Sequence, residues 1–311
     1  MNIGIDVGGT NIKVGLVNDN GEIVLKHSVP TPKDTAENFK NALENAVEEL
    51  LKKADFDVDV KAVGIGVPGI VDRENGILVF SDKIPYGNLN ARELFGKKYN
   101  APVCVENDAN CAAFGEFSVT EGQKDFVFVT LGTGVGGGIV IDGNLYTGLN
   151  GVAAEIGHIT THAGGRDCSC GRKGCLEAYA SVTALIDFTK EISDQLNIDP
   201  SKITGKTAFE EAKKGNAAAL KVRDRWIEEV GIGVASIVNI FQPDEVVIGG
   251  AISKEGSVLL DPIRKYVAEN DYSAGDPSLP KTKINLSRIR EDAGAIGAAL
   301  LGKKYREQVI K

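Results

Sequence analysis

The start of the chain alternates apolar residues with glycine or polar residues, which is the period of a β-strand. Residues 2–7 follow this pattern, Gly8-Gly9-Thr10 interrupts it, and residues 12–17 resume it. Glycine supplies the backbone angles that a tight turn requires. We therefore predict a β-hairpin whose turn consists of glycine and threonine.

The pattern then changes between helical and strand periods. Residues 37–53 carry apolar side chains at helical spacing, and residues 62–67 have the composition of a buried strand that ends at Pro68-Gly69. The other predicted elements are a strand at 103–105, a helix at 109–117, mostly helix over 180–241, a strand at 245–248 and a small-residue helix at 293–301. This succession predicts an α/β fold.

A second hairpin resembles the first one at a fixed distance along the chain. The strand patterns of residues 127–131 and 136–141 and the turn 132–134 repeat the first hairpin with an offset of 124 residues, so that Gly8 aligns with Gly132. Such self-similarity predicts two related lobes, each with a glycine-rich turn. Two unrelated hairpins are the alternative.

No low-complexity linker separates the two predicted lobes. We expect the chain to cross between them near residues 116–124 and to return near residue 290. The first lobe is therefore predicted as residues 1–117 plus about 291–311, and the second lobe as residues 118–290.

Composition and charge narrow the class of protein. With 311 residues, of which 42% are hydrophobic and 25% charged, the chain can bury a large core. The net charge is −8 and the pI about 5.1. A negatively charged protein repels polyanions, so we expect no nucleic-acid partner. The apolar run 230–241 is shorter than the roughly 20 residues that span a bilayer, and residues 1–7 lack a charged leader. We predict a cytoplasmic protein with no membrane partner.

Two sets of glycines, which begin at Gly64 and Gly132, match the spacing of dinucleotide-binding loops. In that fold the glycines open a helix, whereas the strand pattern of residues 139–141 follows the second set. We therefore reject a dehydrogenase. Residues 205–207 lack the upstream glycine of a Walker loop, because Pro200 stands in its place.

The two glycine-threonine turns can instead bind phosphate through backbone N–H groups. Thr10 and Thr133 add hydroxyl donors, and glycine lets phosphate oxygens approach the backbone. Asp6 directly precedes the first turn, where its carboxylate would repel phosphate unless a cation such as Mg²⁺ lay between them. The alternative for Asp6 is a turn-forming aspartate.

Asp108 is the candidate catalytic base. The segment Glu106-Asn107-Asp108 ends a buried strand and enters a helix, where α/β folds bind their ligands. A helix N-terminus favours an ionised carboxylate, which can accept a hydroxyl proton during phosphoryl transfer. Asn107 could hydrogen-bond neighbouring hydroxyl groups. A helix cap is the alternative for Asn107 or Asp108.

Three cysteines and one histidine form the strongest local signal: His158, Cys168, Cys170 and Cys175. Three thiolates and one imidazole fill a tetrahedral zinc site, which we expect to be structural because no coordination position stays open. His162 is a rival for the histidine position. Cys104 and Cys111 have apolar neighbours and are predicted as core residues.

Two carboxylates flank this cluster. Glu155 stands three residues before His158, and Glu177 stands two residues after Cys175, so a metal would draw both towards one place. There they can accept hydrogen bonds from substrate hydroxyl groups. Solvated surface charge is the alternative for each.

The motifs occur in the order found in one known family. They are Asp6-Val-Gly-Gly-Thr10, Glu106-Asn-Asp108, Leu131-Gly-Thr-Gly-Val-Gly-Gly-Gly138, Glu155-Ile-Gly-His158, Cys168-Ser-Cys-Gly-Arg-Lys-Gly-Cys-Leu-Glu177 and Gly249-Gly250-Ala251. Together they resemble the ROK family of bacterial sugar kinases and repressors over nearly the whole chain.

The resemblance implies an actin-like, ribonuclease-H-like pair of α/β lobes with a ligand cleft between them, and Asp108 as the base towards a sugar 6-hydroxyl. The implied sugar-binding residues are Asn107, Asp108, Glu155, His158 and Glu177. The implied residues for nucleotide, phosphate and Mg²⁺ are Asp6, Gly8, Gly9, Thr10, Lys13, Thr133, Gly134, Gly249 and Gly250. The implied zinc ligands are His158, Cys168, Cys170 and Cys175, which disfavours His162.

The resemblance further implies an ATP-dependent hexose kinase with Mg²⁺, structural Zn²⁺ and a dimeric or tetrameric assembly. Glucose is the expected sugar, with N-acetylmannosamine, N-acetylglucosamine, mannose or fructose as alternatives, and residues 80–90, which include Tyr86, are expected to face it. A non-catalytic sugar sensor or repressor is the rival class. We expect no DNA-binding module, because the first predicted strand begins at Asn2.

Overall fold

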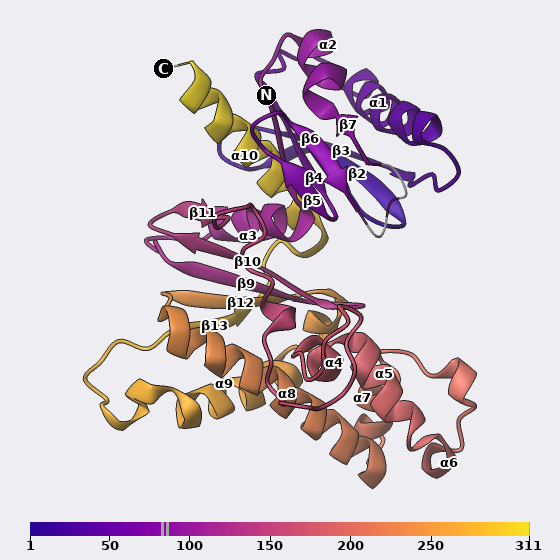
Figure 1. The fold of residues 1–311 in the computed structure, drawn as a ribbon, viewed down its shortest axis with the longest axis vertical. Helices are drawn as coiled ribbons and strands as arrows, with labels where there is room; N and C mark the ends of the chain where they lie inside the picture. Colours follow the sequence, from indigo (N-terminus) through magenta and orange to yellow (C-terminus); the bar gives the residue numbers. More distant parts are fainter. Residues whose placement is uncertain (82–83, 85–86, 311) are drawn as a thin grey trace. The chain divides into compact units, whose positions relative to one another are not determined.

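The computed structural model describes residues 1–81, 84 and 87–310. It divides into two compact units. The first comprises Met1–Gly122, Gly138–Ala153 and the chain from Glu291 onwards, and the second comprises Gln123–Gly137 and Ala154–Arg290. Both chain ends belong to the first unit (Figure 1). The boundaries expected from sequence, at residues 117 and 291, stay a prediction.

The predicted N-terminal hairpin forms the centre of a five-stranded sheet. Its strands are β1 (Asn2–Val7), β2 (Asn11–Val17), β3 (Ile23–Pro30), β4 (Ala62–Val67) and β8 (Val103–Asn107). Their order is β3-β2-β1-β4-β8. β2 pairs antiparallel with β1 and β3, whereas β4 pairs parallel with β1 and β8. The carboxyl ends of β1, β4 and β8 therefore lie at one edge of the sheet, where α/β folds bind ligands.

The remaining elements of the first unit surround this sheet. A small sheet has the order β5-β6-β7, with β5 (Ile70–Asp72), β6 (Ile77–Phe80) and β7 (Leu89–Asn90). The helices are α1 (Ala36–Lys52), the π-helical turn η1 (Arg92–Gly96), α2 (Lys97–Tyr99), α3 (Asp108–Ser118) and α10 (Ala293–Val309), preceded by the 3₁₀ turn η6 (Arg290–Asp292).

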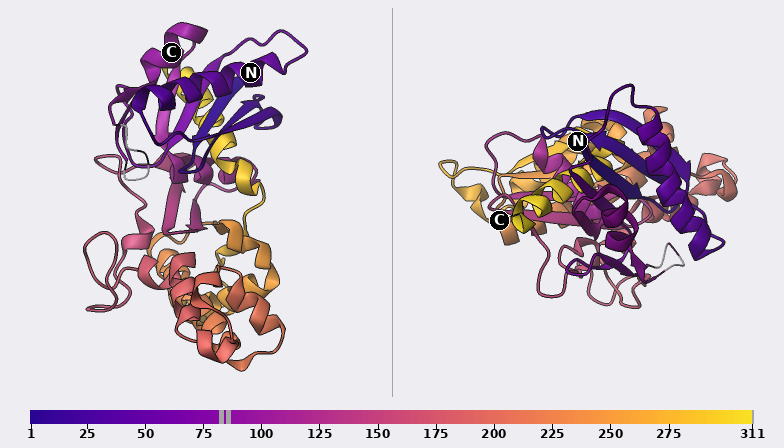
Figure 2. Two further views of the ribbon diagram at one scale, coloured as in Figure 1. Left: turned by 90° about the vertical axis from the view of Figure 1, so that its right-hand side faces the viewer. Right: turned by 90° about the horizontal axis from the view of Figure 1, so that it is seen from above.

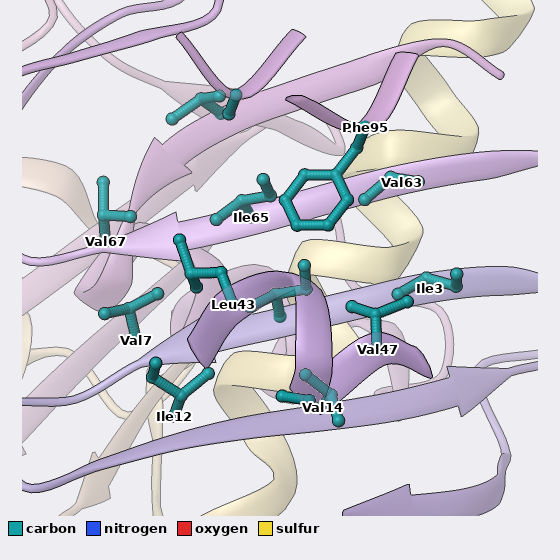
Figure 3. Packing of buried hydrophobic residues seen from close by; sticks show 14 of the residues in the cluster. Ile3, Val7, Ile12, Val14, Leu43, Val47, Val63, Ile65, Val67 and Phe95 are labelled. Atoms are coloured by element: carbon teal, nitrogen blue, oxygen red, sulfur yellow. The ribbon is translucent and has the colours of Figure 1, made fainter. Parts of the chain in front are cut away.

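One face of the sheet carries branched apolar side chains. Successive residues of a strand point to opposite faces, so alternate positions share a face. The side chains that pack between these strands and α1 include Ile3, Val7, Val63, Ile65, Val67, Leu43 and Val47 (Figure 3). Helix α1 begins where the Thr35 hydroxyl accepts a hydrogen bond from Asn38 N at 3.1 Å, and it buries Phe39 and Leu50 on the same stripe.

The opposite face has glycine at its centre, on β1 and β4, and receives α10. A Cβ at Gly4 would overlap the carbonyl oxygen of Ala295, and a Cβ at Gly64 would overlap that of Ala298. Helix α10 therefore lies directly on the strand backbones. The ribbon views show it beside these strands (Figures 1 and 2). Helix α3 joins this layer, because Gly297 lies against the carbonyl group of Cys111. The predicted small-residue helix owes its composition to these close approaches.

The two cysteines outside the cluster are core residues, as predicted, although to different degrees. Cys111 is fully buried on α3, and Cys104 is partly buried on β8. Burial raises the pKa of Cys104 to about 12, so this thiol stays protonated at neutral pH.

A second five-stranded sheet repeats the succession of the first. Its strands are β9 (Phe126–Leu131), β10 (Val135–Ile141), β11 (Asn144–Tyr146), β12 (Glu245–Gly249) and β13 (Lys283–Leu286). The order is β11-β10-β9-β12-β13, and β12 pairs parallel with β9 and β13. β9 ends and β10 begins 124 residues after the corresponding ends of β1 and β2. The sheet orders support the predicted relation between the two halves.

The second unit is mostly helical over residues 180–241, as predicted. Its helices are α4 (Glu177–Ala180), α5 (Val182–Lys190), α6 (Ser193–Leu196), α7 (Thr207–Lys213), α8 (Ala217–Phe241) and α9 (Ser257–Asn270), with 3₁₀ turns η2 (Ile156–His158), η3 (Pro200–Lys202), η4 (Ala251–Glu255) and η5 (Tyr272–Gly275). α8 packs against α4, α7 and α9 (Figure 1). The apolar run 230–241 lies in α8, where most of its residues are buried, although Ile240 in the last turn is exposed.

No helix in the described part of the chain is both long and apolar enough to cross a membrane.

The glycine face of the first sheet makes stability sensitive to one methyl group. In Gly64→Ala the new Cβ meets the backbone of α10, which cannot rotate away, and we expect the free energy of unfolding to fall by about 1–3 kcal/mol. Gly275→Ala is the matched control, because a Cβ there has no neighbour within 4 Å. Urea unfolding of both variants tests this, and equal losses would contradict the packing argument.

Candidate active site

The first glycine turn, residues 8–10, is anchored to its own sheet. Gly8 N donates to Asn11 O at 2.9 Å inside the turn. Thr31, directly after β3, donates from its hydroxyl to Gly8 O at 2.7 Å and from its N–H to Thr10 O at 2.9 Å. Thr10 remains exposed. The turn therefore has a fixed shape and an accessible hydroxyl group, which suits a phosphate-binding role.

Asp6 lies on the glycine face of the sheet, beside the start of α10. A Cβ at Gly294 would stand 2.6 Å from the Asp6 Cγ and 2.7 and 2.8 Å from its oxygens, so the helix backbone approaches the carboxylate closely. Burial raises the pKa of Asp6 to about 6. The positive charge of Lys13 opposes this rise, and the negative charge of Asp108 adds to it. Lys13 lies opposite Asp6 in the hairpin, and its Nζ donates to Glu291 O at 3.1 Å.

These surroundings fit a divalent cation. A half-buried carboxylate that is costly to ionise gains from an adjacent positive charge, and carboxylate oxygen is a preferred ligand of Mg²⁺. Asp6 therefore has the burial and the donor chemistry for the predicted magnesium role, which stays a prediction.

Asn107 and Asp108 stand where β8 meets α3. Asn107 is the N-cap of α3, and its Oδ1 accepts from Ala109 N at 2.9 Å and from Asn110 N at 3.2 Å. Asp108 is the first helical residue, and its Oδ1 accepts from Ala109 N at 2.9 Å. Of the two residues that could cap the helix, Asn107 is the one that does so in this structure. Asp108 lies at the helix N-terminus, where the helix dipole favours the ionised carboxylate that a base requires.

Arg73, which no pattern in the sequence marks, supports this segment. Its Nε donates to Glu106 Oε2 at 2.5 Å, its Nη2 contacts Glu106 Oε1, and Nη2 also donates to Gly151 O at 3.1 Å. Glu106, only 4% exposed, further accepts from Asn107 N at 2.7 Å and from Asn110 Nδ2 at 3.0 Å. A buried glutamate at the end of β8 signals the need for a partner, but its spacing does not identify one 33 residues away.

The four predicted zinc ligands come together in the second unit. One donor atom from each of His158, Cys168, Cys170 and Cys175 lies within 4.8 Å of all the others. The sulfurs of Cys170 and Cys175 are 3.6 Å apart, and Cys168 Sγ is 3.7 Å from His158 Nδ1. Tetrahedral zinc with bonds of about 2.3 Å to sulfur and about 2.0 Å to nitrogen requires edges of roughly 3.8 and 3.6 Å. The donor set and its spacing fit zinc.

A tight turn brings the thiols together. Cys168 N donates to Arg172 O at 2.8 Å, and Gly171 N donates to Cys168 O at 3.0 Å. Hydrogen bonds from the Arg172 backbone and side chain lower the pKa of Cys170 to about 6, whereas burial raises the pKa of Cys175 to about 12. Cys170 therefore already favours the thiolate, whereas Cys175 gains from an adjacent cation in that form.

The rival ligand His162 lies in a different environment. Its ring stacks on Tyr179 with centroids 4.0 Å apart, and its Nε2 is 3.6 Å from Glu229 Oε2. Its Nδ1 is 3.0 Å from the Thr161 hydroxyl. The ring is thus engaged outside the cysteine cluster.

Three further predicted residues of the second unit are Glu155, Gly249 and Gly250. Glu155 is exposed and immediately precedes the 3₁₀ turn that carries His158. Gly249 ends β12 beside Thr130 of β9, and Gly250 has a φ of 92°. A Cβ at Gly250 would overlap the carbonyl oxygen of Leu131, so glycine is required here.

The predicted sugar-binding residues are divided between the units. Asn107 and Asp108 belong to the first unit, whereas Glu155, His158 and Glu177 belong to the second. Tyr86, in the loop expected to face the sugar, lies outside the described residues.

Comparison with known proteins identifies the family. The structure has the actin-like α/β fold of sugar kinases, since it superposes on a ROK family glucokinase from Streptomyces griseus, solved with glucose and AMPPNP, with a TM-score of 0.80 and 35% identity over 97% of this chain and 99% of that one. The TM-score is 0.82 and the identity 32% for a ROK hexokinase from Thermus thermophilus, over 98% and 99% of the two chains.

The sequence comparison agrees with the structural one. ROK family similarity extends over residues 2–305, and a glucokinase from Thermotoga maritima is 39% identical over 97% of each chain. The chain belongs to the ROK family, as its motifs predict.

The carboxylate of Asp6, which is only partly exposed and is desolvated by its surroundings, predicts a pH-dependent penalty on stability. The unfolded chain ionises Asp6 near pH 3.8 and the native protein only near pH 6, so its contribution to stability is lost as pH rises through this interval. Without ligands, Asp6→Asn should be more stable than the wild type by about 1–3 kcal/mol at pH 8, and the two should converge towards pH 4. Urea unfolding across this range tests the prediction, which a pH-independent difference would contradict.

We expect the protein to lose much stability when the ion pair between Arg73 and Glu106 is broken. Arg73→Ala leaves the buried Glu106 carboxylate without its guanidinium, and we expect the free energy of unfolding to fall by about 3 kcal/mol at pH 7. Lys52→Ala breaks the exposed pair with Glu49 and should change it by less than about 1 kcal/mol. Denaturant unfolding compares them, and similar small losses would show that the buried pair does not stabilise the fold.

Proposed function

We propose that the protein is a glucokinase that transfers the γ-phosphate of ATP to the 6-hydroxyl of glucose. The observation that carries the proposal is similarity over nearly the full chain to proteins named glucokinase, one of them solved with glucose and AMPPNP. All the residues that the family resemblance assigns to this reaction are present in the chain. The proposal accounts for both the glycine turns and the carboxylate at the start of α3.

Asp108 is the proposed general base. Phosphoryl transfer needs little covalent work from a protein, so alignment of the hydroxyl and stabilisation of charge dominate the rate. Asp108 accepts the proton of the sugar hydroxyl as the new O–P bond forms and the bond to the β-phosphate oxygen breaks, which releases ADP. Asp108 is the first residue of α3, and a helix N-terminus favours a negative charge placed there.

The nucleotide phosphates are assigned to the two glycine turns. The first site comprises Asp6, Gly8, Gly9, Thr10 and Lys13, and the second comprises Thr133 and Gly134, with Gly249 and Gly250 on the adenosine side. Asp6 would hold Mg²⁺, and this ion supplies positive charge that neutralises the phosphates. The burial and raised pKa of Asp6 support the assignment.

The sugar and zinc assignments support each other. His158, Cys168, Cys170 and Cys175 would hold a structural zinc ion, and their spacing in the structure fits that ion. Glu155 and Glu177, which flank the ligands in sequence, would accept hydrogen bonds from sugar hydroxyl groups together with Asn107. A dimeric or tetrameric assembly and a cytoplasmic location remain parts of the proposal.

A coupled assay of ADP release tests this function. With Mg²⁺-ATP and a panel of hexoses and N-acetylhexosamines, we expect a clear preference for glucose. Asp108→Asn should lower kcat by about 10²–10⁴-fold while glucose affinity, measured by calorimetry, stays within about threefold. Asp194→Asn, an exposed site on α6, is the matched control and should leave kcat unchanged.

The outcomes separate the parts of the proposal. Near-normal kcat in Asp108→Asn would exclude this residue as the base. Preference for another sugar would keep the mechanism and change the substrate, and absence of turnover on every sugar would overturn the kinase.

A further inference from the structure

The second glycine turn is held by one short segment of the chain. Val182 N donates to Gly132 O at 2.9 Å, and the Thr183 hydroxyl donates to Thr133 O at 2.7 Å. The next two residues, Gly134 and the first residue of β10, Val135, both contact Glu177. Its Oε2 accepts from Val135 N at 2.9 Å, and a Cβ at Gly134 would overlap the same oxygen. Each residue from 132 to 135 thus has a contact with segment 177–183.

Glu177 connects this turn to the cysteine loop. It follows Cys175 by two residues, and its Oε1 accepts from the Ser169 hydroxyl at 3.1 Å. Oε1 also lies 3.9 Å from Cys168 Sγ. One carboxylate therefore contacts the cysteine loop with one oxygen and the glycine turn with the other.

The segment itself is fixed to the helical core of the second unit. Ser181 caps α5 by accepting from Ala184 N at 3.0 Å, and the fully buried Trp226 of α8 donates from its indole to Ser181 O at 2.9 Å. Between Glu177 and Thr183, the Ser181 carbonyl is thus bonded to α8 and the Ser181 hydroxyl to α5. The segment is therefore bonded to the helical core on one side and to the second glycine turn on the other.

The first glycine turn is supported in another way. Thr31, which follows a strand of the same sheet, makes the hydrogen bonds that close it. The two turns resemble each other in sequence, but only the second one is held by a segment that continues from the cysteine loop.

We propose that segment 177–183 positions the second glycine turn for nucleotide phosphate, and that Glu177 makes nucleotide affinity depend on the sugar side of the site. The inference rests on the proposed function, which assigns phosphate to this turn and sugar to Glu177. A turn held in its binding shape loses less conformational freedom when phosphate binds, so the bonds from the segment contribute to affinity. Glu177 is thereby a positioning residue for the nucleotide besides a ligand for the sugar.

Thr183 gives the cleanest test, because its side chain is exposed and stands outside the assigned sugar and zinc residues. In Thr183→Val the hydroxyl bond to Thr133 O is lost, and we expect the Kd for Mg²⁺-AMPPNP, measured by calorimetry without sugar, to rise about two- to tenfold. Thr183→Ser keeps the hydroxyl and should bind like the wild type. The KM for glucose should stay unchanged in both variants.

Glu177 tests the link between the two substrates. Glu177→Ala should raise the Kd for Mg²⁺-AMPPNP as well as weakening glucose binding, whereas Glu155→Ala should weaken glucose binding alone. Circular dichroism establishes that each variant is folded. Nucleotide affinity within twofold of the wild type in either Thr183→Val or Glu177→Ala would overturn the proposal.

Failure of the proposed function has a different signature. If the wild type phosphorylates no sugar, the kinase assignment fails, while the nucleotide titrations still report on the turn. If the wild type is an active kinase and only the titrations are insensitive, the positioning role alone is wrong.

Discussion

The direct contact between helix α10 and the strand backbones of the first sheet determines the chemistry of the first unit. Glycines at positions 4 and 64 remove the side chains that would otherwise separate the two layers. The same approach brings Gly294, in the first turn of α10, against the carboxylate of Asp6. Asp6 loses water for this reason, and its pKa rises. The close approach of α10 to the sheet thus produces both the dense packing of the two layers and the desolvation of the Asp6 carboxylate.

Local patterns in the sequence predicted most of the elements. Strand and helix periods placed β1, β2, α1, β4 and α10, and the repeat of 124 residues agrees with the two matching sheet orders. The spacing of the cysteines identified three members of the cluster without any structure. Such features succeed because their cause lies within a few neighbouring residues.

The contacts that sequence analysis missed join distant parts of the chain. Arg73 pairs with a glutamate 33 residues later, and Glu177 bonds to a backbone N–H 42 residues earlier. No period or spacing marks such partners, since they are brought together only by packing. The choice of Asn107 over Asp108 as N-cap was also open, because both are favoured cap residues and the backbone angles at the junction decide between them.

The segment Glu106-Asn107-Asp108 shows how three adjacent polar residues come to have separate tasks. Glu106 is buried and neutralised by Arg73, which fixes the end of β8. Asn107 satisfies the first N–H groups of α3, so the start of this helix does not depend on Asp108 alone. Asp108 is placed in the field of a helix that its neighbours secure, and that field favours its charged form. Exchange of its carboxylate for an amide therefore alters the chemistry of the site more than its architecture.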